Sequence, residues 1–161
     1  MQNKFIHPSA VIEPGANIAK DVRIGPFSYI GSEVTLESGV QIKSHAVVTG
    51  KTKIGQETVI YPFAVVGEIP QDLKFNGEKT CLSIGKRNQI REHVTINTGT
   101  AGGGGLTSIG NDCLFMTGSH IAHDAKVGNR VIIANCGAVA GHCILDDDVI
   151  IGGLSGVHQF V

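Results

Sequence analysis

Aliphatic side chains recur every six residues along most of the chain. The series begins at Ile6, reaches Val66 without a miss, and resumes at Ile84 and again at Ile109. Four residues after each aliphatic position the chain mostly carries Ala, Ser, Thr, Val or Cys, so large and small positions alternate. A period of six fits neither an amphipathic helix, whose period is about 3.6, nor a simple hairpin ladder. It predicts a short extended side followed by a turn, repeated around a solenoid.

Two segments interrupt this series. Between Val66 and Ile84 the segment "GEIPQDLKFNGEKTCLS" lacks an aliphatic and small pair at 70–76, which predicts a loop that projects from the solenoid. Between Ile96 and Ile109 the chain is seven residues longer than the period allows and contains "TGTAGGGGLTS". These glycines are not followed by Gly-Lys-Ser/Thr, so a phosphate-binding loop is not indicated. We expect a flexible surface loop instead, because connecting turns use glycine routinely.

Composition favours one packed domain and excludes several kinds of partner. Only 5% of the 161 residues are aromatic and none is Trp, so Ile, Val, Leu and Ala must fill the core. The 13 Lys and Arg nearly balance the 14 Asp and Glu, which leaves no basic footprint for nucleic acid or anionic lipid. The first residues lack an apolar signal region, and no apolar run approaches the roughly 18 residues of a membrane span. We therefore expect a cytoplasmic protein.

The cysteines are expected to be reduced. The four of them form no Cys-x-x-Cys pair, so neither a disulfide nor a cysteine-bound metal is indicated. Cys113, Cys136 and Cys143 fall inside or beside the predicted coil wall. Apolar surroundings keep a thiol protonated, so these three side chains should react slowly with thiol reagents.

The six-residue pattern resembles the hexapeptide-repeat acyltransferases, in which three hexads form one coil of a left-handed parallel β-helix. The resemblance implies an all-β fold of this kind, a hexapeptide-repeat solenoid with two projecting loops. It also supplies the handedness, because most parallel crossovers are right-handed and the period alone does not overturn that preference. Neighbouring strands of such a helix lie about 4.8 Å apart. Residues 18 positions apart should therefore lie one above the other.

This stacking brings several polar residues of the second half of the chain together. Gly141 lies 18 positions after His123, directly one coil above it. Asp124 and His142 are separated by the same 18 positions, and His158 falls within two residues of that line on the next coil. A single histidine in a repeat is usually a satisfied polar residue, but three of them with an adjacent aspartate indicate a functional site.

Two chemistries suit this cluster. In the first, His123 is a general base that takes a proton from a hydroxyl group, and Asp124 orients its ring. The backbone N–H of Gly141 then stabilises the oxyanion that forms when a thioester carbonyl is attacked. In the second, His120, His123 and His142 bind zinc and leave an open position for water, as in the gamma-class carbonic anhydrases. A structural solenoid without activity is a third hypothesis, which leaves the convergence of histidines to chance.

A closer resemblance rests on four motifs. "HIAHDAKVGN", "AVAGH" and "GVHQF", with the upstream loop "PQDLKFNGE", are similar to the UDP-N-acetylglucosamine 3-O-acyltransferase family of lipid A biosynthesis, over all 161 residues. The resemblance implies transfer of a 3-hydroxyacyl chain from acyl carrier protein to the 3-hydroxyl of UDP-N-acetylglucosamine, without a metal or other cofactor. It also implies a homotrimer with the active cleft between neighbouring subunits. A 3-amino sugar nucleotide is the alternative acceptor, because a histidine base serves either attack.

The same resemblance assigns roles to individual residues. It makes His123 the base for the sugar hydroxyl, Asp124 its partner and Gly141 the oxyanion donor. It makes Asp72 and Lys74 contacts for the sugar nucleotide. Further residues are placed around the same cleft: Gln71, His120, His142, His158 and Gln159. The family continues past the position of Val161 with further coils and a C-terminal helical domain, so residues 1–161 are predicted to form a single β-helix domain that stops before those parts.

Overall fold

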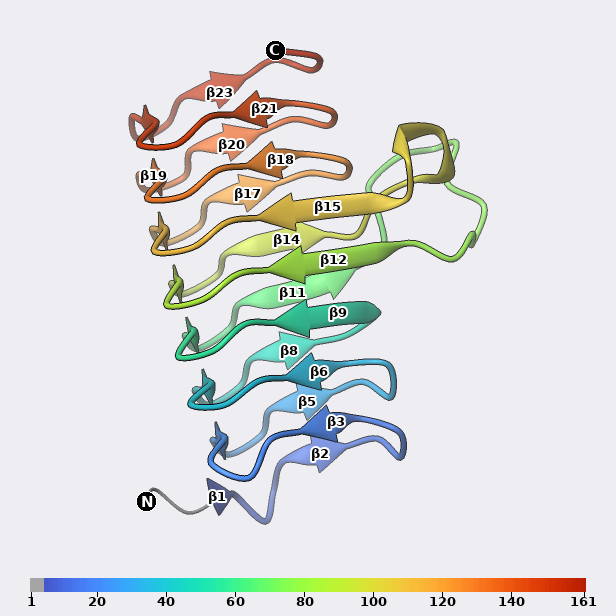
Figure 1. The fold of residues 1–161 in the computed structure, drawn as a ribbon, viewed down its shortest axis with the longest axis vertical. Helices are drawn as coiled ribbons and strands as arrows, with labels where there is room; N and C mark the ends of the chain where they lie inside the picture. Colours follow the sequence, from blue (N-terminus) through green and yellow to red (C-terminus); the bar gives the residue numbers. More distant parts are fainter. Residues whose placement is uncertain (1–4) are drawn as a thin grey trace.

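The chain winds into a three-sided prism of short parallel strands (Figure 1). The computed structural model describes residues 5–161. Most strands are two residues long, because each hexad supplies one short side and spends its other residues on the turn. Each strand from β1 to β20 pairs in parallel with the strand three places further along the chain. The predicted fold, a left-handed parallel β-helix with two projecting loops, is confirmed.

The strands form three sheets, one for each side of the prism. The first contains β1 (Phe5–Ile6), β4 (Arg23–Ile24), β7 (Gln41–Ile42), β10 (Val59–Ile60), β13 (Gln89–Ile90), β16 (Leu114–Phe115), β19 (Ile132–Ile133) and β22 (Ile150–Ile151). The second contains β2 (Val11–Ile12), β5 (Tyr29–Ile30), β8 (Val47–Val48), β11 (Val65–Glu68), β14 (Thr95–Asn97), β17 (His120–Ile121), β20 (Ala138–Val139) and β23 (Gly156–Val157). The third contains β3 (Asn17–Ile18), β6 (Thr35–Leu36), β9 (Lys51–Ile54), β12 (Cys81–Ile84), β15 (Leu106–Ile109), β18 (Lys126–Val127) and β21 (Ile144–Leu145).

The strand register follows the six-residue period. Ile24 pairs with Ile42 and Ile42 pairs with Ile60, a step of 18 residues. The step lengthens at the two projecting loops, where Ile60 pairs with Ile90 and Ile90 with Phe115. These side chains form a vertical column inside the prism, and each is at most 2% exposed. Burial of one such side chain stabilises the fold by about 1.5–3 kcal/mol, so the internal columns carry most of the stability.

The cysteines divide between the wall and the turns. Cys113 and Cys143 are buried, as predicted. Cys136 is exposed and has a φ of 56°, because it occupies a turn between two sides of the prism. The expectation that Cys136 lies in the apolar surroundings of the wall is therefore wrong, and the slow reaction of the buried thiols stays a prediction.

Both projecting loops leave the prism on the same side (Figure 1). The first connects β11 to β12, and the second connects β14 to β15 and contains a short 3₁₀ helix, η1 (Ala101–Gly103). A carboxylate oxygen of Glu78 in the first loop accepts a hydrogen bond from the N–H of Ala101 in the second, at 3.3 Å. The two loops therefore contact each other outside the regular coils.

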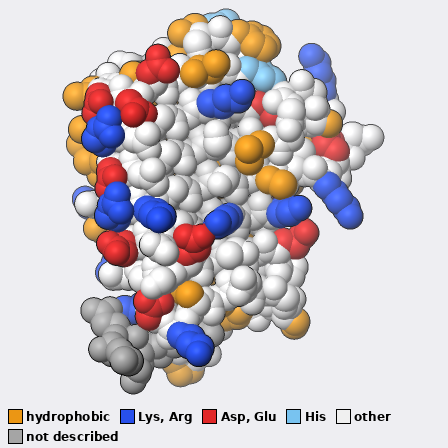
Figure 2. All heavy atoms as spheres, in the orientation of Figure 1, with side chains coloured by type: hydrophobic (Ala, Val, Ile, Leu, Met, Phe, Trp, Pro, Cys, Tyr) orange, Lys and Arg blue, Asp and Glu red, His pale blue; other side chains and the backbone are white. Residues whose placement is uncertain are grey.

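Charged side chains of both signs are interspersed over the face seen in Figure 2. Arg87 lies 2.7 Å from Asp112, and Arg130 lies 2.7 Å from Asp148, in pairs that join successive coils. Exposed ion pairs of this kind contribute little to stability. Within residues 5–161, no helix has both the length and the apolar character that crossing a membrane requires.

Candidate active site

Two successive turns bring the predicted catalytic residues together. His123 and Asp124 lie in the turn after β17, and Gly141 and His142 lie in the equivalent turn after β20, one coil higher. The N–H of His142 donates to the carbonyl of His123 at 3.1 Å, which holds the two turns in register. Asp124 and His142 have φ values of 59° and 61°, the left-handed conformation that Asp and His adopt more readily than most residues. The stacking predicted from the 18-residue step is thus observed.

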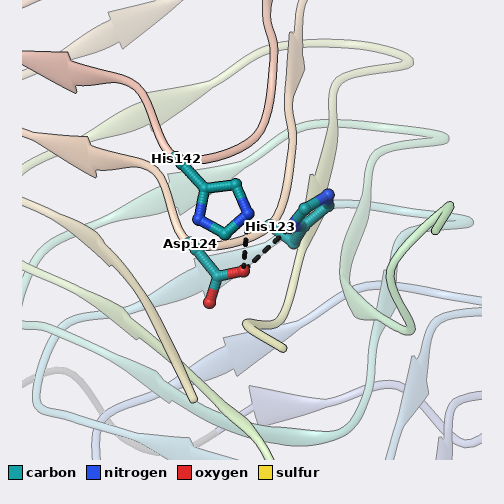
Figure 3. A group of neighbouring side chains, drawn as sticks. All are labelled: His123, Asp124 and His142. Carbon is teal, nitrogen blue, oxygen red and sulfur yellow. Dashed lines mark hydrogen bonds and ion pairs between the residues drawn. The ribbon is translucent and has the colours of Figure 1, made fainter. Parts of the chain in front are cut away.

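His123 and Asp124 form a buried pair (Figure 3). The Nδ1 atom of His123 lies 2.8 Å from Oδ2 of Asp124, and the two side chains are 9% and 1% exposed. An ionised carboxylate accepts hydrogen bonds and has no hydrogen to donate. Nδ1 of His123 therefore carries the hydrogen, and Nε2 has the free lone pair. This tautomer is the one a general base needs when it takes a proton through Nε2.

His142 lies beside this pair. Its Nε2 is 3.9 Å from Oδ2 of Asp124, and its ring meets the ring of His123 edge-on, with 5.1 Å between the centroids (Figure 3). The His142 ring also stacks on the ring of Phe160, with 4.8 Å between the centroids. His142 is 24% exposed in its side chain, more than His123, so it is the ring that meets solvent.

The carboxylate of Asp124 lies beneath the glycine-rich loop. The N–H of Thr100 donates to Oδ1 at 2.8 Å, and the Thr100 hydroxyl donates to Oδ2 at 2.6 Å. Burial raises the pKa of a carboxyl group, but the hydrogen bonds from Thr100 and His123 outweigh burial and hold the pKa of Asp124 below its usual value. Asp124 is therefore ionised at neutral pH.

The sequence did not predict this role of Thr100. The loop was expected to be a flexible surface segment, and its tip is exposed, but Thr100 is only 6% exposed and covers the aspartate. The one available signal was position: the extra seven residues occur one coil before Asp124, in the same corner of the solenoid.

Gly141 leaves room for the ring of His123. A Cβ atom at position 141 would lie 2.6 Å from Cε1 and 2.7 Å from Nε2 of that ring, closer than real contacts allow. Among residues 5–161 the N–H of Gly141 donates to no backbone carbonyl. A free N–H next to the base is the arrangement that the predicted oxyanion role requires.

Two hollows lie beside His123 and His142 and are lined by the other predicted residues. The first, which we call the inner hollow, has a volume of about 480 Å³ and includes Gln71, His120, His123, Gly141, His158 and Gln159 in its lining. The second, the outer hollow, has a volume of about 330 Å³ and includes Asp72, Lys74 and His142. Asp124 is buried and lines neither hollow. The structure thus brings all of the predicted site residues into one region, in two separate groups.

The ligand set expected for zinc is not brought together. Within residues 5–161 the side chains that approach closely enough to share a metal ion are His123, Asp124 and His142, whose ligand atoms lie within 4.8 Å of one another. His120 lies outside this group, and its Nδ1 is 2.7 Å from the hydroxyl of Thr95. Burial lowers the pKa of His120, which keeps its ring neutral. The hypothesis that His120, His123 and His142 together bind zinc is therefore wrong, because His120 is not close enough to the other two to share the ion.

Three parallel sheets built from hexads define the fold as a hexapeptide-repeat solenoid, and one of its turns carries a buried histidine–aspartate pair. Residues 106–137 match the family described as bacterial transferase hexapeptide (six repeats). A curated acyl-[acyl-carrier-protein]–UDP-N-acetylglucosamine O-acyltransferase of Paracoccus denitrificans is 69% identical over 103 residues, which are 64% of this chain and 40% of that protein.

Solved structures agree with this similarity. LpxA of Acinetobacter baumannii superposes with a TM-score of 0.94 and 50% identity over 97% of this chain and 60% of that one. The UDP-N-acetylglucosamine O-acyltransferase of Moraxella catarrhalis gives a TM-score of 0.94 and 47% identity over 96% of this chain and 60% of that one. The resemblance to UDP-N-acetylglucosamine acyltransferases predicted from the sequence is confirmed, and this chain spans 40–60% of the length of these relatives.

Proposed function

We propose that this chain carries the catalytic β-helix of an enzyme that transfers a 3-hydroxyacyl chain from acyl carrier protein to the 3-hydroxyl of UDP-N-acetylglucosamine, the first step of lipid A biosynthesis. The observation that carries the proposal is the His123–Asp124 pair at 2.8 Å, with the ring of His123 lining the inner hollow. The similarity to acyltransferases of that name supports the choice of substrates.

The geometry supports a direct transfer between the two substrates. Nε2 of His123 takes the proton from the sugar hydroxyl as its oxygen attacks the thioester carbonyl. The negative charge moves onto the carbonyl oxygen, where the N–H of Gly141 donates to it. Collapse of this intermediate breaks the carbon–sulfur bond, and the carrier-protein thiol leaves with the proton from the imidazolium. Asp124 stabilises that imidazolium throughout, because its carboxylate faces Nδ1.

The outer hollow suits the sugar nucleotide. Asp72 and Lys74 lie there beside His142, on the loop between β11 and β12. Oδ1 of Asp72 accepts from the N–H of Lys74 at 2.9 Å, a turn that shapes the loop and leaves the second carboxylate oxygen for a sugar hydroxyl. The ammonium group of Lys74 is suited to a phosphate. Residues around the inner hollow, His158 and Gln159 among them, complete the cleft in this proposal.

Assembly, cofactor and location belong to the same proposal. The acyl group arrives as a thioester, so the chemistry needs no metal or other cofactor from the protein. We propose a homotrimer whose cleft lies between neighbouring subunits, and a cytoplasmic location. The arrangement expected from the resemblance, a single β-helix domain over 1–161 followed by further coils and a helical domain, stays a prediction.

Replacement of His123 tests the function. In the full-length protein, His123→Ala should reduce kcat by about a hundred- to ten-thousand-fold, equivalent to about 3–5 kcal/mol of transition-state stabilisation. KM for the sugar nucleotide should change little, because the base acts in the transition state. His142→Ala should instead raise KM or cost less in kcat, since a residue that holds substrate acts in both states.

Acyl transfer should be measured with 3-hydroxy and 3-amino sugar nucleotides and acyl chains of several lengths. His7→Ala, in the first coil, is the matched histidine control and should retain wild-type kcat. Near-normal turnover by His123→Ala would contradict the proposed mechanism. A clear preference for the 3-amino acceptor would replace the oxygen nucleophile with nitrogen and leave the same base in place.

A further inference from the structure

The hydroxyl of Thr100 is held in one orientation. Its oxygen accepts a hydrogen bond from the N–H of Gly103 at 3.2 Å, at the first turn of η1. Its proton is therefore directed to Oδ2 of Asp124, 2.6 Å away. The N–H of the same residue meets Oδ1 at 2.8 Å, so one residue contacts both oxygens of the carboxylate.

The loop around Thr100 is shaped to accept this carboxylate. A Cβ atom at Gly103 would collide with Cγ and both carboxylate oxygens of Asp124. A Cβ atom at Gly99 would lie 2.8 Å from Oδ1. At Gly102, between them, an added Cβ would meet no atom within 4 Å. Glycine is thus required at the two positions that face Asp124, and space is available at the position that does not.

Oδ2 of Asp124 accepts from both Thr100 and His123. A carboxylate with a single partner can rotate about its Cβ–Cγ bond, which would change the direction of the hydrogen bond to Nδ1 of His123. Thr100 removes this freedom by holding both oxygens. The backbone N–H of Asp124 is also bound, because it donates to the hydroxyl of Thr107 at 2.8 Å. The orientation of the imidazole is therefore set partly by the loop between β14 and β15.

We propose that Thr100 is a positioning residue for the acyl transfer: it orients Asp124, and through it His123, without contacting the substrate at its hydroxyl. This inference rests on the proposed function. The positioning role would explain why the coil is seven residues longer at this point, because the longer loop brings the hydroxyl of Thr100 to the carboxylate of Asp124. Thr100 also lines the outer hollow, but its N–H and its hydroxyl proton are both bound to Asp124, so we expect the effect mainly in turnover.

Four variants of the full-length enzyme test this. Thr100→Val keeps the size of the side chain but removes its hydroxyl, and kcat should fall about ten-fold with KM within about two-fold. Thr100→Ser restores the hydroxyl and should recover most of the loss. Gly103→Ala should reduce kcat at least as much as Thr100→Val. Gly102→Ala, whose added Cβ does not meet Asp124, is the control for the orientation of the pair; it is compared through the resonance described below, because Gly102 lines the outer hollow.

A second readout does not depend on activity. The downfield proton resonance of the Nδ1–H of His123, identified by its loss in His123→Ala, should shift or broaden in Thr100→Val and Gly103→Ala and stay in place in Gly102→Ala. Thermal unfolding of each variant shows whether it is folded. If Thr100→Val does not fold, Thr100→Ser and the comparison of Gly103→Ala with Gly102→Ala decide the question.

The outcomes separate this inference from the proposed function. Wild-type kcat together with an unshifted resonance in Thr100→Val and Gly103→Ala would overturn the positioning role and leave the function standing. Full turnover by His123→Ala would overturn the proposed function, and the resonance would still report whether Thr100 orients the pair. A shift of the resonance in Gly102→Ala equal to that in Gly103→Ala would also count against the positioning role, because it would assign the effect to the loop in general.

Discussion

At the scale of single residues, the missing side chain at position 141 determines how the candidate base is held. The ring of His123 occupies the space that a Cβ atom on Gly141 would need. Gly141→Ala must therefore move the imidazole or the turn, and a displacement of about 1 Å costs on the order of a hundred-fold in rate. We expect kcat for acyl transfer to fall by that factor, because the base and the N–H of residue 141 both lose their positions. Steady-state kinetics on the purified variant check this.

Gly152→Ala is the control for this substitution. Its added Cβ meets only the hydroxyl oxygen of Ser155, at 3.4 Å, an ordinary contact. We expect unchanged kinetics for this variant. Equal activity of Gly141→Ala and the wild type would show that the close approach of residue 141 and His123 is unimportant for catalysis.

At the scale of the elements, one side chain of β14 holds the start of the loop between β11 and β12. Nδ2 of Asn97 donates to the carbonyls of Glu68 at 3.4 Å and of Ile69 at 3.1 Å, where that loop begins. Asn97 is only 3% exposed, and its loss removes two of the hydrogen bonds that hold the start of the loop. Asn97→Ala should make the loop more mobile, raise the KM for the sugar nucleotide several-fold and accelerate tryptic cleavage after Lys74 and Lys79.

Limited proteolysis followed by mass spectrometry measures this mobility. Asn76→Ala is the matched control, because Asn76 lies in the same loop and uses its backbone N–H, not its side chain, to bind Glu78. We expect wild-type cleavage rates for that variant. Unchanged cleavage in Asn97→Ala would mean that the contact between Glu78 and Ala101 holds the loop on its own.

The regular coils were predictable because one period sets both strand and register. The step of 18 residues predicts that His142 stacks on Asp124, and the structure agrees. The paths of the two loops were not predictable, because they depend on hydrogen bonds between residues that the period does not relate. Thr100 and Asp124 are 24 positions apart, and nothing in "TGTAGGGG" specifies a carboxylate as its partner. The sequence indicated the extra length and its location, and the folded geometry was needed for the contact.

At the scale of the whole molecule, the loop between β11 and β12 carries an apolar side chain away from the prism. Leu73 is fully exposed and lies between Asp72 and Lys74, the residues proposed to meet the sugar nucleotide. Ile69, at the start of the same loop, is 58% exposed. Exposed apolar residues beside functional ones are typical of a surface that another chain covers. The flat sides of the prism allow parallel packing of copies, so we assign this surface to the neighbouring subunit of the proposed trimer.

Leu73→Ser tests that assignment together with the location of the cleft. Burial of a leucine contributes about 1.5–3 kcal/mol, so its loss at each contact should weaken assembly by about ten- to a hundred-fold. Light scattering of the wild type should give three times the mass of one chain, and the variant should dissociate at a higher concentration. If the neighbouring subunit completes the cleft, the kcat per chain of Leu73→Ser falls on dilution together with the mass and recovers on concentration. A stable wild-type monomer at micromolar concentration would contradict the trimer, and a variant that dissociates with constant kcat would place the complete site within one chain.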